Sequence, residues 1–195
     1  MDSKHNKITL YTTQRPIVMK TLEEKGIYHV KREFIQQKYK EVSHLFLQCY
    51  DWFIRKAQNI VNRPEWAEYP IWTFTDPKYA GYFQDSFLIT LEVPKEEVIF
   101  FKIEDWNRIL NLRYLPRDDQ DEFKYMSKLK TYNIEDETEI FMKPFYPQLK
   151  SEVQKSWNNL FKYDKMIKKN GLPEKPIQGS LWEMRKTWIS NTRKC

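Results

Sequence analysis

The chain is poor in the residues that build most recognisable functional sites. Its 195 residues include only two cysteines, three histidines and four glycines. The glycines stand singly, which excludes a glycine-rich loop that cradles phosphates. The cysteines and histidines are too few and too scattered for a zinc site, and there is no Gly-x-Ser-x-Gly motif. The sequence therefore predicts no metal cofactor and no hydrolase of these types.

Long apolar runs are missing as well. No window approaches the roughly eighteen apolar residues of a membrane span, and no signal-like apolar stretch follows residues 1–7. Cys49 and Cys195 cannot make the framework of a disulfide-rich secreted domain. We therefore expect a cytoplasmic protein that does not interact with membranes.

Aromatic residues are plentiful, at 16% of the chain, with seven Trp, twelve Tyr and twelve Phe. A net charge of +6 accompanies them, but the 33 Lys and Arg are interspersed with 27 acids, as on an ordinary solvated surface. Each buried aromatic side chain removes roughly 150–250 Å² from water. The supply exceeds what one core of this size usually takes, so some aromatic residues are expected to serve binding.

Hydrophobic periodicity predicts an α+β fold. Alternating or continuous apolar residues predict strands at 8–13, 69–75, 86–93, 98–103 and 177–184, and three-to-four-residue spacing predicts helices at 16–25, 33–62 and from 147 onward. We expect one domain over residues 1–195, with a central mixed or antiparallel sheet of about five or six strands packed with three or four helices. Residues 117–139 are mostly charged and are interpreted as a surface excursion containing one short helix.

Polar residues lie among aromatic residues on three of these predicted strands. A pocket that holds a flat ring between aromatic side chains is built from such material. The simpler interpretation is that the threonines are ordinary strand formers and the tryptophans belong to the core. The candidate residues are Tyr11, Thr12, Thr13 and Gln14 on the first strand, Trp72, Thr73 and Thr75 on the second, and Gln178, Trp182 and Glu183 on the last.

Two sets of landmarks resemble a known family. The Tyr-Pro-Ile-Trp sequence at 69–72 and the Ile-Gln-x-x-x-Trp-Glu sequence at 177–183 are similar to an uncharacterised bacterial family known only as a domain of unknown function. Further landmarks at 91–98, 106–111 and 156–161 extend this resemblance over nearly the whole chain. The resemblance brings no established activity with it.

The layout of the strands more distantly resembles the ADP-ribosyltransferase superfamily, in which three strands hold a nicotinamide dinucleotide. The resemblance implies that NAD binds with its rings stacked on aromatic residues, its ribose bonded to hydroxyls, and Gln178 or Glu183 at the reacting ribose. The implied cofactor-binding residues are Tyr11, Thr12, Thr13, Gln14, Trp72, Thr73, Thr75 and Trp182. The first strand lacks the expected Arg or His. Gln178 also cannot supply the negative charge that stabilises an oxocarbenium-like centre, so binding is better supported than transfer.

Two hypotheses follow. The first is an ADP-ribosyltransferase-like domain that binds NAD and modifies a nucleic acid or a protein, which requires Thr13, Thr75 and Gln178 to converge on one cleft. The alternative is a non-enzymatic module that binds nucleic acid or protein, such as a component of a phage-conflict or toxin–antitoxin system. In that case the surplus aromatic residues and dispersed Lys and Arg form a basic stacking groove.

Overall fold

The chain forms two compact units in a computed structural model that describes residues 6–31 and 43–195, with side chains in the second range from residue 47 onward. The sheet unit comprises Met1–Phe100 and Asn170–Cys195, and the helical unit comprises Phe101–Lys169. The helical unit is therefore an insertion between two segments of the sheet unit. The expectation of a single domain over residues 1–195 stays a prediction.

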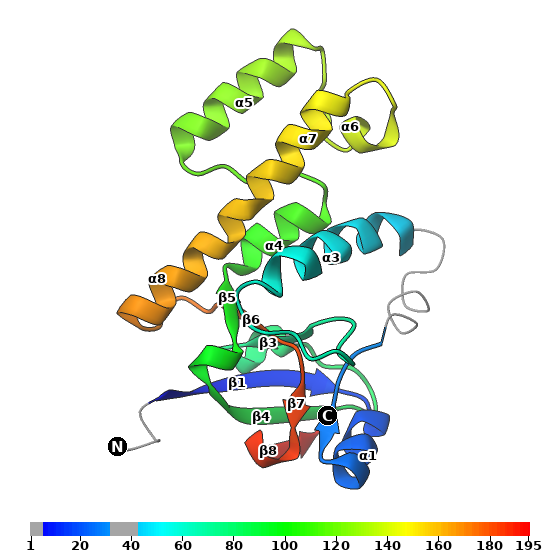
Figure 1. Cartoon of the computed structure of the whole chain (residues 1–195), viewed down its shortest axis with the longest axis vertical. Helices are drawn as coiled ribbons and strands as arrows, with labels where there is room; N and C mark the ends of the chain where they lie inside the picture. The colour runs from blue at the N-terminus through cyan, green and yellow to red at the C-terminus, as the bar shows by residue number, and fades with distance from the viewer. Residues whose placement is uncertain (1–5, 32–42) are drawn as a thin grey trace. The chain divides into compact units, whose positions relative to one another are not determined.

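The sheet unit is built on six strands in the order β5-β6-β3-β1-β4-β8, which Figure 1 shows for β1, β4 and β8. The pairs β1–β3, β1–β4, β3–β6 and β4–β8 are all antiparallel. A second, two-stranded sheet pairs β2 (Ile27–Tyr28) with β7 (Met184–Arg185). The six strands are β1 (Lys7–Gln14), β3 (Ile71–Phe74), β4 (Phe87–Pro94), β5 (Ile99–Phe101), β6 (Gln178–Leu181) and β8 (Ile189–Lys194).

The six-stranded sheet has two unlike faces, because successive side chains of a strand point to opposite sides. One face, here called the core face, carries fully buried residues such as Leu10, Ile71 and Leu91. The other, here called the polar face, carries Tyr11 and the residues aligned with it. Burial of the apolar core face provides the main stabilisation of this unit.

Two helices of the sheet unit follow the predicted pattern in part. Helix α1 (Pro16–Lys25) begins with its proline in the first turn and ends at Gly26, as predicted. Helix α3 (Ser43–Ala57) confirms residues 43–57 of the helix predicted over 33–62 and ends five residues earlier than predicted, whereas residues 33–42 lie outside the described residues. The Tyr50 and Phe53 rings of α3 lie edge-on to Trp72 of β3 at 5.6 and 5.3 Å.

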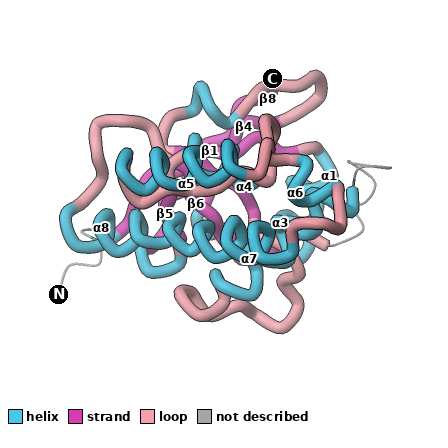
Figure 2. The backbone as a smooth tube through the Cα atoms, turned by 90° about the horizontal axis from the view of Figure 1, so that it is seen from above, coloured by secondary structure: helices cyan, strands magenta, loops and turns pink. Residues whose placement is uncertain are grey.

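The helical unit contains α4 (Ile103–Leu110), α5 (Asp119–Thr131), the short α6 (Glu139–Met142), α7 (Pro147–Ser156) and α8 (Lys162–Asn170). A 3₁₀ segment, η5 (Trp157–Phe161), joins α7 to α8, so that the three form a nearly continuous rod (Figure 1). Figure 2 shows the helices of this unit as coiled tubes. The apolar stripe predicted after Pro147 is buried at Leu149, Val153 and Trp157.

The charged stretch 117–139, which we expected to be a surface excursion with one short helix, forms a long helix with buried residues. Helix α5 spans 13 residues and buries Tyr125 and Leu129, and Ile134 behind it is buried too. The α+β fold with five or six strands is confirmed. The described residues contain seven α-helices, more than the expected three or four.

Strand β8 was not predicted. It lies at the edge of the sheet, and the last five of its six residues are exposed, so it lacks an apolar pattern. The predicted strand 177–184 is shorter, ending at Leu181. Among the residues described, no helix is long and apolar enough to cross a membrane.

Candidate functional site

The polar residues predicted on β1 form hydrogen bonds mainly with other residues of the sheet unit. The Thr12 hydroxyl donates to the Trp72 carbonyl at 2.9 Å and accepts from the Gln14 amide at 2.8 Å. The Thr13 hydroxyl donates to the Gly81 carbonyl at 2.7 Å. Both threonines are buried, so their hydroxyls satisfy local backbone groups.

The predicted residues of β3 behave in the same way. The fully buried Thr73 hydroxyl donates to the Gly179 carbonyl at 3.0 Å. Thr75 accepts from the Ile177 amide at 2.9 Å, which ties the end of β3 to the start of β6. The Trp72 indole N–H donates to the Tyr50 hydroxyl at 3.1 Å and is thereby fixed against α3.

The residues predicted on the last strand are buried. Gln178 is 4% exposed and lies on the polar face, opposite Phe74. Glu183 accepts from the Arg185 Nε at 2.6 Å. The Trp182 indole donates to the Val61 carbonyl at 2.9 Å, and its ring is almost fully buried. Trp182 therefore belongs to the core of the sheet unit.

The strand register decides which of these residues share a face. Tyr11 pairs with Phe74, and Phe74 pairs with Gln178, so these three side chains point to the polar face together. Thr13, two residues after Tyr11, shares that face. Thr75 lies one residue beyond the end of β3, where strand alternation no longer assigns it a face. Thr13 and Gln178 therefore share the polar face, whereas the Thr75 hydroxyl bonds to the Ile177 backbone.

A row of aligned residues crosses the polar face over five strands. From β6 to β8 it consists of Gln178, Phe74, Tyr11, Thr90 and Asn191. Gln178 is buried, the next three are half-buried and Asn191 is exposed. The polar face therefore becomes open to solvent toward the β8 edge.

The loop after β3 adds aromatic residues to this face. The Tyr79 ring stacks on Phe74, with centroids 6.5 Å apart and planes 26° apart. Thr13 holds Gly81 over β1, and the next residue, Tyr82, lies against Arg193 of β8, whose guanidinium is 5.9 Å from the ring. The loop thus crosses from β3 to β8.

We call the resulting patch the aromatic sheet surface. Tyr79 and Tyr82 are 49% and 55% exposed, so a large part of each ring is open to solvent. Arg193 donates to the Tyr82 hydroxyl at 3.3 Å and brings a positive charge to the patch. The surface consists of Tyr11, Phe74, Tyr79, Tyr82 and Arg193.

The helical unit has a separate groove of about 550 Å³. One wall is the connection between α4 and α5, with Tyr114 and Arg117. The other wall is one face of α7 and η5, formed by Gln148, Ser151, Glu152, Lys155, Ser156 and Asn159. These residues recur at three- and four-residue intervals, as one face of a helix requires. That spacing is visible in the sequence as the polar side of the helix whose apolar stripe begins at Leu149.

Hydrogen bonds hold the connection between α4 and α5 beside this groove. The Ser156 hydroxyl accepts from the Leu115 amide at 2.9 Å, and the Asn159 amide donates to the Leu115 carbonyl at 2.8 Å. The Tyr114 amide donates to Glu137 at 2.7 Å, and the Tyr114 ring stacks on Tyr125 with centroids 4.0 Å apart. The connection between α4 and α5 is therefore held on both sides.

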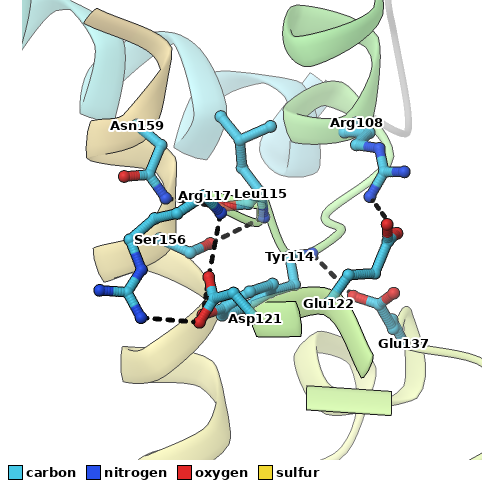
Figure 3. Close-up of polar contacts among 9 residues, drawn as sticks. All are labelled: Arg108, Tyr114, Leu115, Arg117, Asp121, Glu122, Glu137, Ser156 and Asn159. Atoms are coloured by element: carbon cyan, nitrogen blue, oxygen red, sulfur yellow. Dashed lines mark hydrogen bonds and ion pairs between the residues drawn. The ribbon is translucent and has the colours of Figure 1, made fainter. Parts of the chain in front are cut away.

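The Asp121 carboxylate accepts several hydrogen bonds from the connection between α4 and α5 (Figure 3). Its carboxylate accepts from the Arg117 side chain and the Arg117 amide, both at 3.0 Å, and from the Tyr114 hydroxyl at 3.2 Å. The Arg117 guanidinium is the main cause that lowers the Asp121 pKa to about 2. Burial, reinforced by the Asp121 charge, raises the Tyr114 pKa to about 12. Asp121 thus stays ionised and Tyr114 stays neutral at ordinary pH.

Within the part of the chain that the structure describes, no group of three His, Cys, Asp or Glu is arranged to hold a metal ion. The aromatic sheet surface and the groove of the helical unit are candidate sites for a ligand.

The comparison with known families matches residues 9–190 to the domain of unknown function named DUF3841. The chain belongs to this family. The match covers nearly the whole length and agrees with the landmarks at 69–72 and 177–183. No curated protein and no solved structure matches the DUF3841 chain.

Proposed function

We propose that this DUF3841 protein is a nucleic-acid-binding module that stacks unpaired bases on its aromatic sheet surface. The main observation in support of this proposal is that Tyr11 and Phe74 are direct neighbours on the polar face, with Tyr79 stacked on Phe74. Arg193 beside Tyr82 adds a cation at the β8 edge. The proposal keeps the expectation of a cytoplasmic protein.

The chemistry of the surface suits single strands. Stacking of a base on an aromatic side chain contributes about 1–3 kcal/mol and tolerates any sequence, because every base has a flat face. A guanidinium near the rings attracts phosphates and itself stacks on bases. A duplex hides its base faces, so single-stranded RNA or DNA is the expected ligand.

Fluorescence anisotropy with labelled single-stranded RNA and DNA tests the proposal. Tyr79→Ala and Tyr82→Ala are each expected to weaken binding about ten-fold, and affinity should fall steeply between about 50 and 200 mM salt. Tyr132→Ala is the matched control, since Tyr132 is also 49% exposed but lies in the helical unit. Undetectable or salt-insensitive binding, or equal loss in the control, would remove the proposal. Binding of a protein partner instead of single-stranded nucleic acid would also contradict the proposal.

A second candidate is NAD bound on the same polar face, favoured by the alignment of Gln178 with Phe74 and Tyr11. An adenine or nicotinamide ring would stack on these rings, with the Gln178 amide near a ribose. Calorimetry with NAD on the wild type, Gln178→Ala and Glu183→Ala distinguishes the candidates. NAD binding that Gln178→Ala abolishes and Tyr82→Ala leaves intact would favour the dinucleotide; no binding at millimolar NAD would eliminate it.

A further inference from the structure

We propose that the groove of the helical unit is a phosphate-binding site, with Arg117 and Lys155 as its charged donors. The proposal is independent of the aromatic sheet surface, because all its residues belong to the helical unit. The ligand is a phosphate group, carried by a small molecule or by the end of a nucleic-acid chain.

Arg117 is held in place and still has donors to offer. Its Nη2 donates to Asp121 at 3.0 Å, which restrains the guanidinium (Figure 3). Over residues 6–31 and 43–195, its Nη1 and Nε have no hydrogen-bond partner. A guanidinium presents five N–H donors in a planar fork that matches phosphate oxygens. Asp121 thus positions the fork and leaves part of it for a ligand.

Lys155 supplies the second cation from the opposite wall. It is exposed, lines the groove and makes no ion pair or hydrogen bond through its side chain with any residue that the structure describes. Ser151 and Gln148 precede it by one and two helical turns on the same face and bring a hydroxyl and an amide. Cations on both walls with neutral donors between them form a setting suited to an anion.

Two of the carboxylates near the groove are paired with cations. Asp121 is paired with Arg117, and Glu152 is paired with Lys128 at 2.5 Å. Lys155 therefore remains as an uncompensated positive charge on the groove wall. This balance favours an anionic ligand over a cationic one.

The dimensions of the groove favour a ligand larger than a bare ion. A volume of about 550 Å³ lies within the roughly 300–1,000 Å³ range of sites for small organic ligands. Tyr114 lines the groove with an aromatic ring beside the cations. A nucleoside monophosphate or a 5′-phosphorylated strand end fits these features better than inorganic phosphate does.

The test is an NMR titration of the ¹⁵N-labelled full chain with inorganic phosphate, AMP and short oligonucleotides with and without a 5′-phosphate. Saturable shifts are expected at the amides of residues 114–117 and 148–159, with a Kd on the order of 1 mM for inorganic phosphate. Lys155→Ala should weaken binding about ten-fold, as loss of one charge-assisted hydrogen bond predicts. Tighter binding of AMP than of the 5′-phosphorylated strand would identify a small-molecule ligand, and the reverse a strand end.

Lys165→Ala is the matched control, because Lys165 is an exposed lysine of α8 outside the groove. It should bind phosphate as the wild type does. Arg117→Lys, which keeps the charge but not the fork, should bind with intermediate affinity. The proposal is overturned if no saturable shift appears up to about 50 mM phosphate, well beyond the expected Kd, or if Lys165→Ala weakens binding as much as Lys155→Ala.

Discussion

Gly179 is the residue at which the core face of the sheet has no room for a methyl group. A Cβ at this position would lie 2.9 Å from both the Thr73 hydroxyl and a methyl group of Val98. The same Thr73 hydroxyl donates to the Gly179 carbonyl, so it cannot move without losing that bond. A glycine is therefore required here by close packing between β3 and β6.

We expect Gly179→Ala to lower the free energy of unfolding by about 1–3 kcal/mol, the usual result of overpacking a core. Urea denaturation followed by tryptophan fluorescence measures it. Ser180→Ala, at the next position of β6 but on the polar face, serves as the control and should cost less. Equal stability of Gly179→Ala and the wild type would show that the contact relaxes freely.

A second prediction at this scale concerns Asp121 and acid. Its pKa is lowered from the ordinary 3.8 to about 2 by Arg117, so the pair stabilises the fold fully above about pH 4. That contribution is lost as the pH falls through about 2. Asp121→Asn should therefore be less stable than the wild type by about 1–2 kcal/mol at pH 7.

The difference between wild type and Asp121→Asn should shrink steadily from pH 4 to pH 2 in urea denaturation. Asp119→Asn is the control, because Asp119 is exposed in the same helical turn and has no side-chain partner among residues 6–31 and 43–195. A difference that stayed constant over this range would mean that the charge of Asp121 contributes nothing.

At the scale of elements, the Thr13 hydroxyl is one of the anchors of the loop after β3. The buried Thr13 hydroxyl holds the Gly81 carbonyl, and Tyr79 and Tyr82 flank this anchor in the chain. Thr13→Val keeps the shape but removes the donor. We expect a loss of about 1 kcal/mol, faster hydrogen exchange over residues 77–84 and weaker binding of single strands.

Thr90→Val is the matched control for the loop. Thr90 also lies on the polar face, half-buried, but its hydroxyl has no hydrogen-bond partner within the described part of the chain. Its replacement should leave exchange in the loop unchanged. Unaltered exchange in Thr13→Val would mean that other contacts suffice to hold the loop.

The local hydrophobic pattern of the sequence predicts the helices and strands that have an apolar face, and it misses those that lack one. Strand β1 and strand β4 agree with their predicted ranges to within one residue because their alternation is strong. Strand β8 is exposed, and its pairing with β4 makes it a strand. Such tertiary pairing leaves no local pattern in the sequence.

The candidate site divides in the same way. The aromatic site residues predicted on β1 and β3 were Tyr11 and Trp72. Tyr11 lies beside Phe74, which was not predicted, and Trp72 packs against α3. Which threonine hydroxyls bond to backbone depends on strand register, which alternation within one strand does not reveal. The approach of Tyr82 to Arg193, 111 residues later, is likewise a tertiary contact.

At the scale of the whole molecule, the two cysteines report on different parts of the sheet unit. Cys49 of α3 is completely buried, and burial raises its pKa to about 12. Cys195 is exposed and unpaired with another cysteine. Only a thiolate reacts with an alkylating reagent, so Cys49 becomes reactive only when α3 separates from the core.

We therefore expect the native protein to react with iodoacetamide at one thiol, and the denatured protein at two, as counted by intact mass. Cys195→Ser should reduce native labelling to none. The slow labelling of Cys49 then measures the opening of the sheet unit. Gly179→Ala should accelerate this labelling by the factor that its loss of stability predicts. That factor is about ten-fold for each 1.4 kcal/mol when opening is in rapid equilibrium. If Cys49 were alkylated as fast as Cys195 in the native state, α3 would not be part of a stably packed core. If Gly179→Ala left the rate unchanged, α3 would open by itself while the sheet stayed folded.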